Sequence, residues 1–473
     1  MLFNSSAFLC FFIIVTTAFF LLPHRARWAL LLGASCFFYM FFKPEYILIL
    51  FFTIVIDYFA GIWLEKIQDK KKKKWFLVLS IVANVGVLVI FKYYNFLNDN
   101  LTGLCTLFGV ENPVPYFDIV LPIGLSFHTF QAMSYTIEVY RGKVPAEKHF
   151  GIYSLYVMFY PQLVAGPIER PQNILHQFHE KKYFSFENAG IGLNLIFLGL
   201  FKKVVVADRL AIYVDEVYAH LETMNSFSAI IAVIFFSFQI YCDFSGYSDI
   251  ARGTAKFMGY DLMVNFRQPY LSSSISEFWT RWHISLSTWF KDYVYIPLGG
   301  NRRGNLIKYR NLMVVFLISG IWHGASWTFV IWGCLHALFV VAEGWMENSR
   351  ISLPKLLGFS TEAPLYRLIR IGFIFMLVSF AWIFFRAESF DQALAVISKI
   401  GAMDFTLNLP QVFAYKGPLN MLLSLAAIGL LLMAAKLPHV LEKRVSPYFL
   451  VTATVLIIFL GTNESAQFIY FQF

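Results

Sequence analysis

Long apolar runs constrain this chain more than any other feature of its sequence. A helix needs about 20 apolar residues to cross a bilayer, and about twelve runs approach that length. The chain is 58% hydrophobic and 14% charged, whereas soluble proteins carry about 25% charged residues. The sequence therefore predicts an all-α polytopic membrane protein, with runs at 5–22, 28–43, 46–65, 75–96, 118–138, 188–206, 227–247, 311–328, 330–346, 367–386, 419–436 and 448–462.

Two further apolar segments, residues 150–168 and 271–299, are interrupted by Pro, Gly and charge. Such segments survive at membrane depth only when buried in protein or facing water, which suggests re-entrant or interfacial helices. We expect one membrane domain over residues 1–473, with about 11–13 transmembrane helices. The N-terminus lacks a positive n-region and a cleavage site, so it is expected to be a retained first span.

Short basic loops predict the sidedness of the chain. They are separated by even numbers of the expected crossings, so all can be cytoplasmic together, with both termini outside. The net charge of +9 is better explained by this topology and by anionic lipid than by nucleic acid. The cations lie at Arg25 and Arg27, residues 69–74, Arg141 and Lys143, residues 301–310 and residues 436–444.

The cysteines suggest neither a disulfide framework nor a metal site. They are scattered through mostly apolar segments without CxxC or other metal-ligand spacing, as expected of small buried side chains.

Four stretches carry more polarity than a passive span should, because polar groups in hydrocarbon are costly and are retained for a reason. The first is 121–142, with Ser126, His128, Gln131, Ser134 and Glu138. The second is 241–253, with Asp243, Ser245, Asp249 and Arg252. The third is 276–300, with Arg281, His283, Lys291 and Asp292 among three tryptophans. The fourth is 319–333, with His323 and, further on, His336.

Each stretch also has a purely structural interpretation. These are interhelical hydrogen bonds for His128 and Glu138, ion pairing with Arg252 or another cation for Asp243 and Asp249, an interfacial anchor for His283, and a satisfied core histidine for His323.

His323 follows Arg310 by 13 residues, which places it roughly 20 Å along a helix from the cytoplasmic loop. It is therefore expected beyond the middle of the bilayer. Burial favours the neutral imidazole, the state that a general base needs. Gly324 and Ala325 are expected to leave space beside it for a substrate. These residues permit proton abstraction in a protected cavity.

His336 lies 13 residues after His323, or ~220° around an ideal helix. The two histidines share a face only if Gly324 or Gly333 breaks the helix. No metal site is expected from this pair.

Together these motifs resemble the membrane-bound O-acyltransferase family, in its branch of alginate O-acetyltransferases and related bacterial cell-surface acetylation proteins. The matching motifs follow the family's order over nearly the whole chain. They are "LPIGLSFHTFQAMSYTIEVYRG" (121–142), "YPQLVAGPIERP" (160–171), "YCDFSGYSDIARG" (241–253), "FWTRWHISLSTWFKDYVYIPLGG" (278–300), "GIWHGASWTFVIWGCLHA" (320–337), "FAWIFFRAESFDQA" (380–393) and "FIYFQF" (468–473).

The resemblance implies a ring of tilted helices around a central tunnel, with the catalytic motifs concentrated in residues 241–340. His323, in the WHG motif, matches the family's catalytic histidine. His283, in RWH, matches a second histidine at the cytoplasmic side of the tunnel. Ala337 departs from the glycine of many members, which affects only packing near His336.

The resemblance also implies roles for neighbouring residues. Trp322 and Trp327 are expected to shape the cavity, while the oxyanion contact stays open among Asn, Ser, Tyr and backbone N–H groups. His283, with Arg281 and Lys291, is expected to receive an anionic donor such as acetyl-CoA or another acyl thioester. No bound cofactor is expected. The remaining candidate substrate or tunnel residues are Asp292, Ser245, Asp243 and His128.

The expected function is transfer of an acetyl or other acyl group across a bacterial inner membrane, for O-acetylation of alginate or another exopolysaccharide. A separate SGNH-type partner outside the cytoplasm is expected to complete the transfer. Peptidoglycan O-acetylation and D-alanylation of teichoic acid stay open, although length and closing segments favour the alginate and peptidoglycan branch. Two other classes are a scaffold without catalysis and a proton-coupled transporter using His128, Glu138, Asp243 and Asp249.

Overall fold

The computed structural model describes residues 1–119, 121–348, 363–405, 417–433, 440–442, 445–462 and 468–471, and within these ranges it contains helices and no β-strand. The longer helices are α1 (Ser6–Leu21), α2 (His24–Met40), α3 (Tyr46–Lys66), α4 (Lys70–Leu88), α5 (Tyr94–Leu107), α6 (Leu125–Tyr140), α7 (Phe150–Met158), α8 (Pro171–His179), α9 (Phe186–Leu200), α10 (Asp208–Ala219), α11 (Ser226–Phe257), α14 (Asn305–His323), α15 (Trp327–Asn348), α17 (Pro364–Arg386), α18 (Phe390–Gly401), α20 (Gly417–Met433) and α22 (Pro447–Leu460).

Short helical pieces complete the chain. The segments predicted to be interrupted are broken in the structure, since α7 ends in turns and residues 269–295 form four short elements. The short elements are π-helical η1 (Val89–Tyr93), η2 (Phe201–Ala207) and η5 (Lys291–Tyr295), 3₁₀-helical η3 (Leu221–Thr223), η4 (Pro269–Leu271) and η7 (Ile469–Phe471), and α12 (Ile275–Arg281) and α13 (Ile284–Phe290).

Six helical stretches of the described chain are long and apolar enough to cross a membrane. They are 46–66, 70–107, 186–219, 226–257, 327–346 and 364–386, and three shorter apolar helices accompany them. The all-α polytopic fold is therefore confirmed. The other expected spans are shorter or carry charge in the structure, and residues 434–436 of one expected span lie outside the described residues, as does most of the last basic loop.

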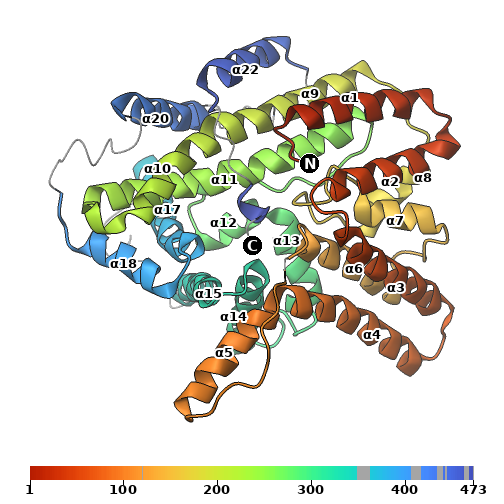
Figure 1. Cartoon of the computed structure of the whole chain (residues 1–473), viewed down its shortest axis with the longest axis horizontal. Coiled ribbons are helices and arrows are strands. Elements are labelled where there is room, and N and C mark those ends of the chain that lie inside the picture. The colour runs from red at the N-terminus through yellow and green to blue at the C-terminus, as the bar shows by residue number, and fades with distance from the viewer. Residues whose placement is uncertain are drawn as a thin grey trace.

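Helix α11 lies at the centre, and α9 runs beside it (Figure 1). Glycines bring the two backbones together: a Cβ added at Gly199 would lie 2.5 Å from the carbonyl oxygen of Gly246, and one at Gly253 would lie 2.5 Å from that of Gly192. Small residues at an interface let membrane helices pack backbone to backbone. Any larger side chain at these positions would force α9 away from the core.

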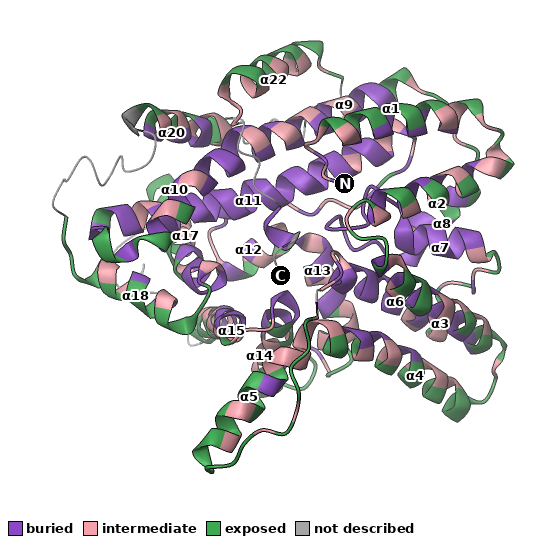
Figure 2. Ribbon diagram, in the orientation of Figure 1, coloured by how far each residue is buried: buried purple, intermediate pink, exposed green. Residues whose placement is uncertain are grey.

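The most buried helices are those near the central α11. The middle of the molecule, including α6, α7 and α11, is buried, whereas α5, α18, α20 and α22 expose much of their surface at the edge (Figure 2). Large apolar side chains are among the exposed groups, such as Ile14, Leu48, Val82, Leu422 and Val451. Exposed apolar side chains of this kind are covered by the bilayer in a membrane protein.

Buried ion pairs tie α11 to η2. Lys202 Nζ lies 2.6 Å from Asp249, and Lys203 Nζ lies 2.7 Å from Asp243 and 2.8 Å from Asp208. Arg252 also approaches Asp249, at 3.8 Å. Asp243 and Asp249 of α11 are therefore both paired with cations, as their structural interpretation predicts.

The last described turn, η7, lies in the middle of the molecule beside α11 to α13 (Figure 1). The backbone N–H of Ile469 donates to Asp243 Oδ2 at 2.7 Å. Asp243 thus uses one oxygen for Lys203 and the other to hold the C-terminal turn at the centre.

Candidate active site

The candidate site forms where α14 ends. His323 is the last residue of α14, Gly324 is extended (φ −162°, ψ 154°), and α15 begins at Trp327. The two helices then pack at glycines, since a Cβ added at Gly320 or Gly333 would lie 2.4 Å from a backbone carbonyl oxygen of the other helix. The break at Gly324, which the sequence left open, is present.

His323 is buried among aromatic rings. Its ring centroid lies 4.9 Å from Trp322, 4.9 Å from Trp332, 5.3 Å from Phe385 and 5.9 Å from Tyr470. Nδ1 has no hydrogen-bond partner among the described residues. Such a nitrogen costs free energy unless a further group satisfies it, which makes it a candidate contact for substrate.

A cavity of ≈ 20 Å³ adjoins His323. This volume holds about one water molecule. Its wall combines the first turn of α6, the end of α14 and the C-terminal turn: Lys92, Leu121, Pro122, Gly124, Leu125, Ser126, Phe127, Trp322, His323 and Tyr470.

His283 belongs to the same aromatic cluster. It caps the start of α13 in the left-handed region (φ 43°) and is fully buried. Its ring lies 6.2 Å from both Trp322 and Tyr470, the rings that also contact His323, and 4.6 Å from Phe244. This burial does not fit the interfacial-anchor alternative. Neither ring nitrogen has a partner among the described residues.

His336 lies on the far side of one tryptophan. The Trp332 ring is 4.9 Å from His323 and 4.9 Å from His336, so it separates the two imidazoles. Within the described residues no group of three or more His, Cys, Asp or Glu side chains is arranged to hold a metal ion.

Two expected features of the cavity are corrected. Trp327 does not line it, because this side chain is 55% exposed and donates from Nε1 to Asn100 at 2.9 Å. The space expected beside Gly324 is filled by Phe329, whose ring would lie 2.0 Å from an added Cβ. Trp322 does border the cavity, and its ring stacks on Phe130 at 5.3 Å.

Lys92 and Tyr470 also reach the site, and neither is among the site residues that the sequence predicts. Lys92 Nζ donates to the carbonyl oxygens of Trp322 and His323 at 2.7 and 3.0 Å. A single lysine inside the apolar run 75–96 is itself a signal of function. Tyr470 is far away in sequence, and only the fold brings it to His323.

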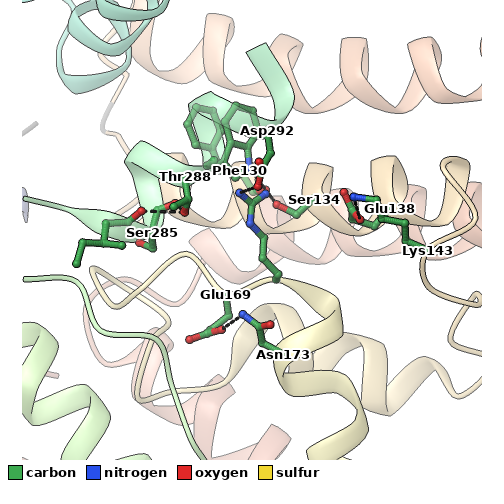
Figure 3. Close-up of polar contacts among 12 residues, drawn as sticks. Phe130, Ser134, Glu138, Lys143, Glu169, Asn173, Ser285, Thr288 and Asp292 are labelled. Carbon is green, nitrogen blue, oxygen red and sulfur yellow. Dashed lines mark hydrogen bonds and ion pairs between the residues drawn. The ribbon is translucent and has the colours of Figure 1, made fainter. Parts of the chain in front are cut away.

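Other predicted site residues lie apart. The ring of His128 faces Tyr39 at 5.9 Å, and Ser245 is buried within α11. Glu138 pairs with Arg141 at 3.1 Å and with Lys143 at 3.4 Å (Figure 3). Both ion pairs lie near the end of its own helix.

The residues predicted to form the entrance for the donor do not form one cationic cluster. Arg281 pairs with Glu277 at 2.6 Å, and Lys291 is exposed. Asp292 pairs with Arg170 at 3.2 Å (Figure 3), and its backbone oxygen accepts from Arg141 at 2.9 Å. The guanidinium groups of Arg141 and Arg170 also lie over the Tyr293 ring, at 5.0 and 4.3 Å.

The sequence profile of the membrane-bound O-acyltransferase family matches residues 147–385. The chain belongs to this family. The matched range contains His283, His323 and His336 and ends at Phe385, which packs on His323. The chain is therefore an O-acyltransferase with a multi-pass membrane domain.

Curated relatives cover most of the chain. A probable alginate O-acetylase AlgI of Pseudomonas putida is 37% identical over 396 residues, 83% of this chain and 79% of that protein. A peptidoglycan O-acetyltransferase of Helicobacter pylori is 36% identical over 435 residues, 84% and 79%. A teichoic acid D-alanyltransferase of Streptococcus thermophilus is 27% identical over 323 residues, 64% and 72%.

Proposed function

We propose that this acyltransferase moves an acetyl group from cytoplasmic acetyl-CoA to a hydroxyl acceptor reached from outside, for O-acetylation of a cell-surface polysaccharide such as alginate. The observation that carries the proposal is His323 at the end of α14: it is buried, its Nδ1 has no partner among the described residues, and the residue borders a cavity. The acetyl transfer named for the alginate and peptidoglycan relatives supports the choice of acyl group.

In the proposed reaction His323 acts as general base. It removes the acceptor hydroxyl proton as the oxygen attacks the thioester carbonyl. The new C–O bond forms, the C–S bond breaks, and the departing thiolate takes up the proton that His323 accepted. The ≈ 20 Å³ cavity is too small for these groups, so the surrounding side chains must move apart during turnover.

The anionic donor enters from the cytoplasmic face in this proposal. The support is the group of cations around Tyr293 and Asp292, with Arg141 and Arg170 nearest and Lys291 exposed beside them. A cationic mouth attracts a phosphate-bearing carrier. We place the chain in the bacterial inner membrane with both termini outside, and we assign final transfer to an SGNH-type partner outside the cytoplasm.

Acetate released by alkali tests the proposal. It is assayed separately on purified exopolysaccharide and peptidoglycan from cells with natural protein or His323→Ala at equal membrane abundance. We expect His323→Ala to abolish acetylation of one polymer, because the proton acceptor is lost. His176→Ala, an exposed histidine, is the matched control and retains acetylation.

Each outcome of the acetate assay either identifies the acceptor polymer or contradicts the proposal. Loss only from peptidoglycan redirects the assignment to that polymer, and loss of D-alanine from teichoic acid redirects both donor and acceptor. Normal acetylation by His323→Ala at normal abundance removes His323 as base and favours a scaffold.

The transporter alternative has less structural support. Its proposed relay residues Asp243, Asp249 and Glu138 are engaged with lysines or arginine, and His128 faces Tyr39. These contacts do not form a continuous path for a proton.

A further inference from the structure

A π-helical turn places Lys92 beside the end of α14. The turn η1 joins α4 to α5 within a continuous helical stretch, residues 70–107. Such a turn inserts an extra residue into the helix and redirects the side chains around it, often at functional sites. Here it directs two neighbouring side chains, Lys92 and Tyr93, at one helix terminus.

Those two side chains bind three successive carbonyls. Tyr93 donates to the oxygen of Ile321 at 2.8 Å, and Lys92 donates to those of Trp322 and His323. The last carbonyls of a helix have no partner within it and carry partial negative charge, so a cation there is stabilising. Together the pair caps the final turn of α14.

Lys92 is arranged unlike the two buried lysines of η2. Lys202 and Lys203 pair with carboxylates, whereas Lys92 has two carbonyl oxygens and the Ser126 hydroxyl at 3.4 Å as its acceptors. An ammonium has three protons, so these acceptors use them all. One of its three contacts is the backbone of His323 itself.

We infer that Lys92 is a positioning residue for His323: with Tyr93, it fixes the last turn of α14 so that the imidazole faces the cavity. The inference rests on the proposed role of His323, because Lys92 acts through that side chain. A displacement of about 1 Å at a reacting group can cost about 100-fold in rate. A residue that holds the backbone of a base therefore affects turnover without touching substrate.

Two readouts on purified protein test this inference: the kinetics of acetyl transfer and amide hydrogen exchange of residues 316–326. We expect Lys92→Met, which keeps the apolar stem, to lower kcat about 100-fold with little change in KM for acetyl-CoA. Exchange should accelerate in the last turn of α14 and not elsewhere. Lys92→Arg should recover much of kcat, because it restores the charged donor.

Lys202→Met is the matched control, since it removes a lysine whose partner is Asp249. It should lower stability without accelerating exchange at the end of α14. If Lys92→Met fails to accumulate, Tyr93→Phe, which deletes a single hydroxyl, carries the same comparison with a smaller expected effect. Unchanged exchange and kcat in these variants overturn the inference, as does faster exchange throughout the protein.

The exchange measurement also separates this inference from the proposed function. If the natural protein transfers no acetyl group, the proposed function fails, while local loosening of α14 in Lys92→Met still supports the cap.

Discussion

Glu169 is a single residue whose ionisation should be visible in stability. Its carboxylate is fully buried and accepts hydrogen bonds from the Met263 backbone N–H and, at 3.4 Å, from the Asn173 side chain (Figure 3). Burial raises its pKa from 4.5 to about 7, although these hydrogen bonds partly oppose the change. Glu169 lies in a loop outside the membrane-spanning helices.

The raised pKa predicts how stability depends on pH. Between the ordinary pKa of 4.5 and the folded value of about 7, the folded protein holds a proton that the unfolded chain releases. Stability contributed by this group therefore falls as pH rises through that window. Glu169→Gln should flatten the fall in the thermal unfolding midpoint of detergent-solubilised protein. Exposed Glu187→Gln is the control, and curves for Glu169→Gln parallel to the natural protein would contradict the prediction.

At residue scale the sequence was most informative where a polar group interrupts an apolar run. His323 and His283 were singled out in this way, and the fold brings both to Trp322 and Tyr470. Trp327 could not be placed, because helical periodicity is lost across the extended Gly324. The same signal that drew attention to His323 also marks Lys92.

At the scale of elements, the α14–α15 pair depends on two glycines. An added Cβ at Gly320 would lie 2.4 Å from the Phe329 carbonyl oxygen, and a backbone atom cannot rotate away as a side chain can. Gly320→Ala should therefore separate the helices and destabilise the protein by about 1–3 kcal/mol. Thermal unfolding measures the change.

Gly372→Ala in α17 is the matched control for this prediction, since nothing lies within 4 Å of its added Cβ. Alanine favours a helix over glycine by up to ~1 kcal/mol, so this control should be neutral or stabilising. Equal stability of the two alanine variants would contradict the close approach.

The positions of helices could be predicted from the sequence where the length of an apolar run determines them. The run at 75–96 was expected as one span, but the helical stretch continues to residue 107 through η1. The run at 118–138 becomes helical only at Leu125, after Pro122 and the left-handed Gly124 (φ 77°). Hydropathy is insensitive to both features, because a π-turn and a left-handed glycine are determined by backbone geometry.

Contacts distant in sequence assemble the whole molecule around its C-terminal turn. Asp243 binds both Lys203 and the Ile469 N–H, and Tyr470 lies 4.1 Å from Phe244. Composition and periodicity did not predict this arrangement, because they carry no information about which distant segments meet. Only the resemblance to the family indicates that the closing motif matters.

The position of Tyr470 predicts that this turn seals the site. Its ring lies 5.9 Å from His323 and 6.2 Å from His283, and it lines the small cavity. Tyr470→Ala should widen the cavity and admit water, which competes with the acceptor hydroxyl for the thioester. We expect less acetyl transferred for each CoA released, measured with labelled acetyl-CoA and normalised to folded protein.

Ile458→Ala provides the control, because that α22 side chain is 70% exposed and remote from the cavity wall. It should leave the ratio of acetyl transferred to CoA released unchanged. A decline of both quantities in proportion in Tyr470→Ala would mean that Tyr470 supports folding or donor binding without excluding water. A fall in the ratio alone would establish that the end of the chain keeps hydrolysis out of an acyl transfer site within the membrane.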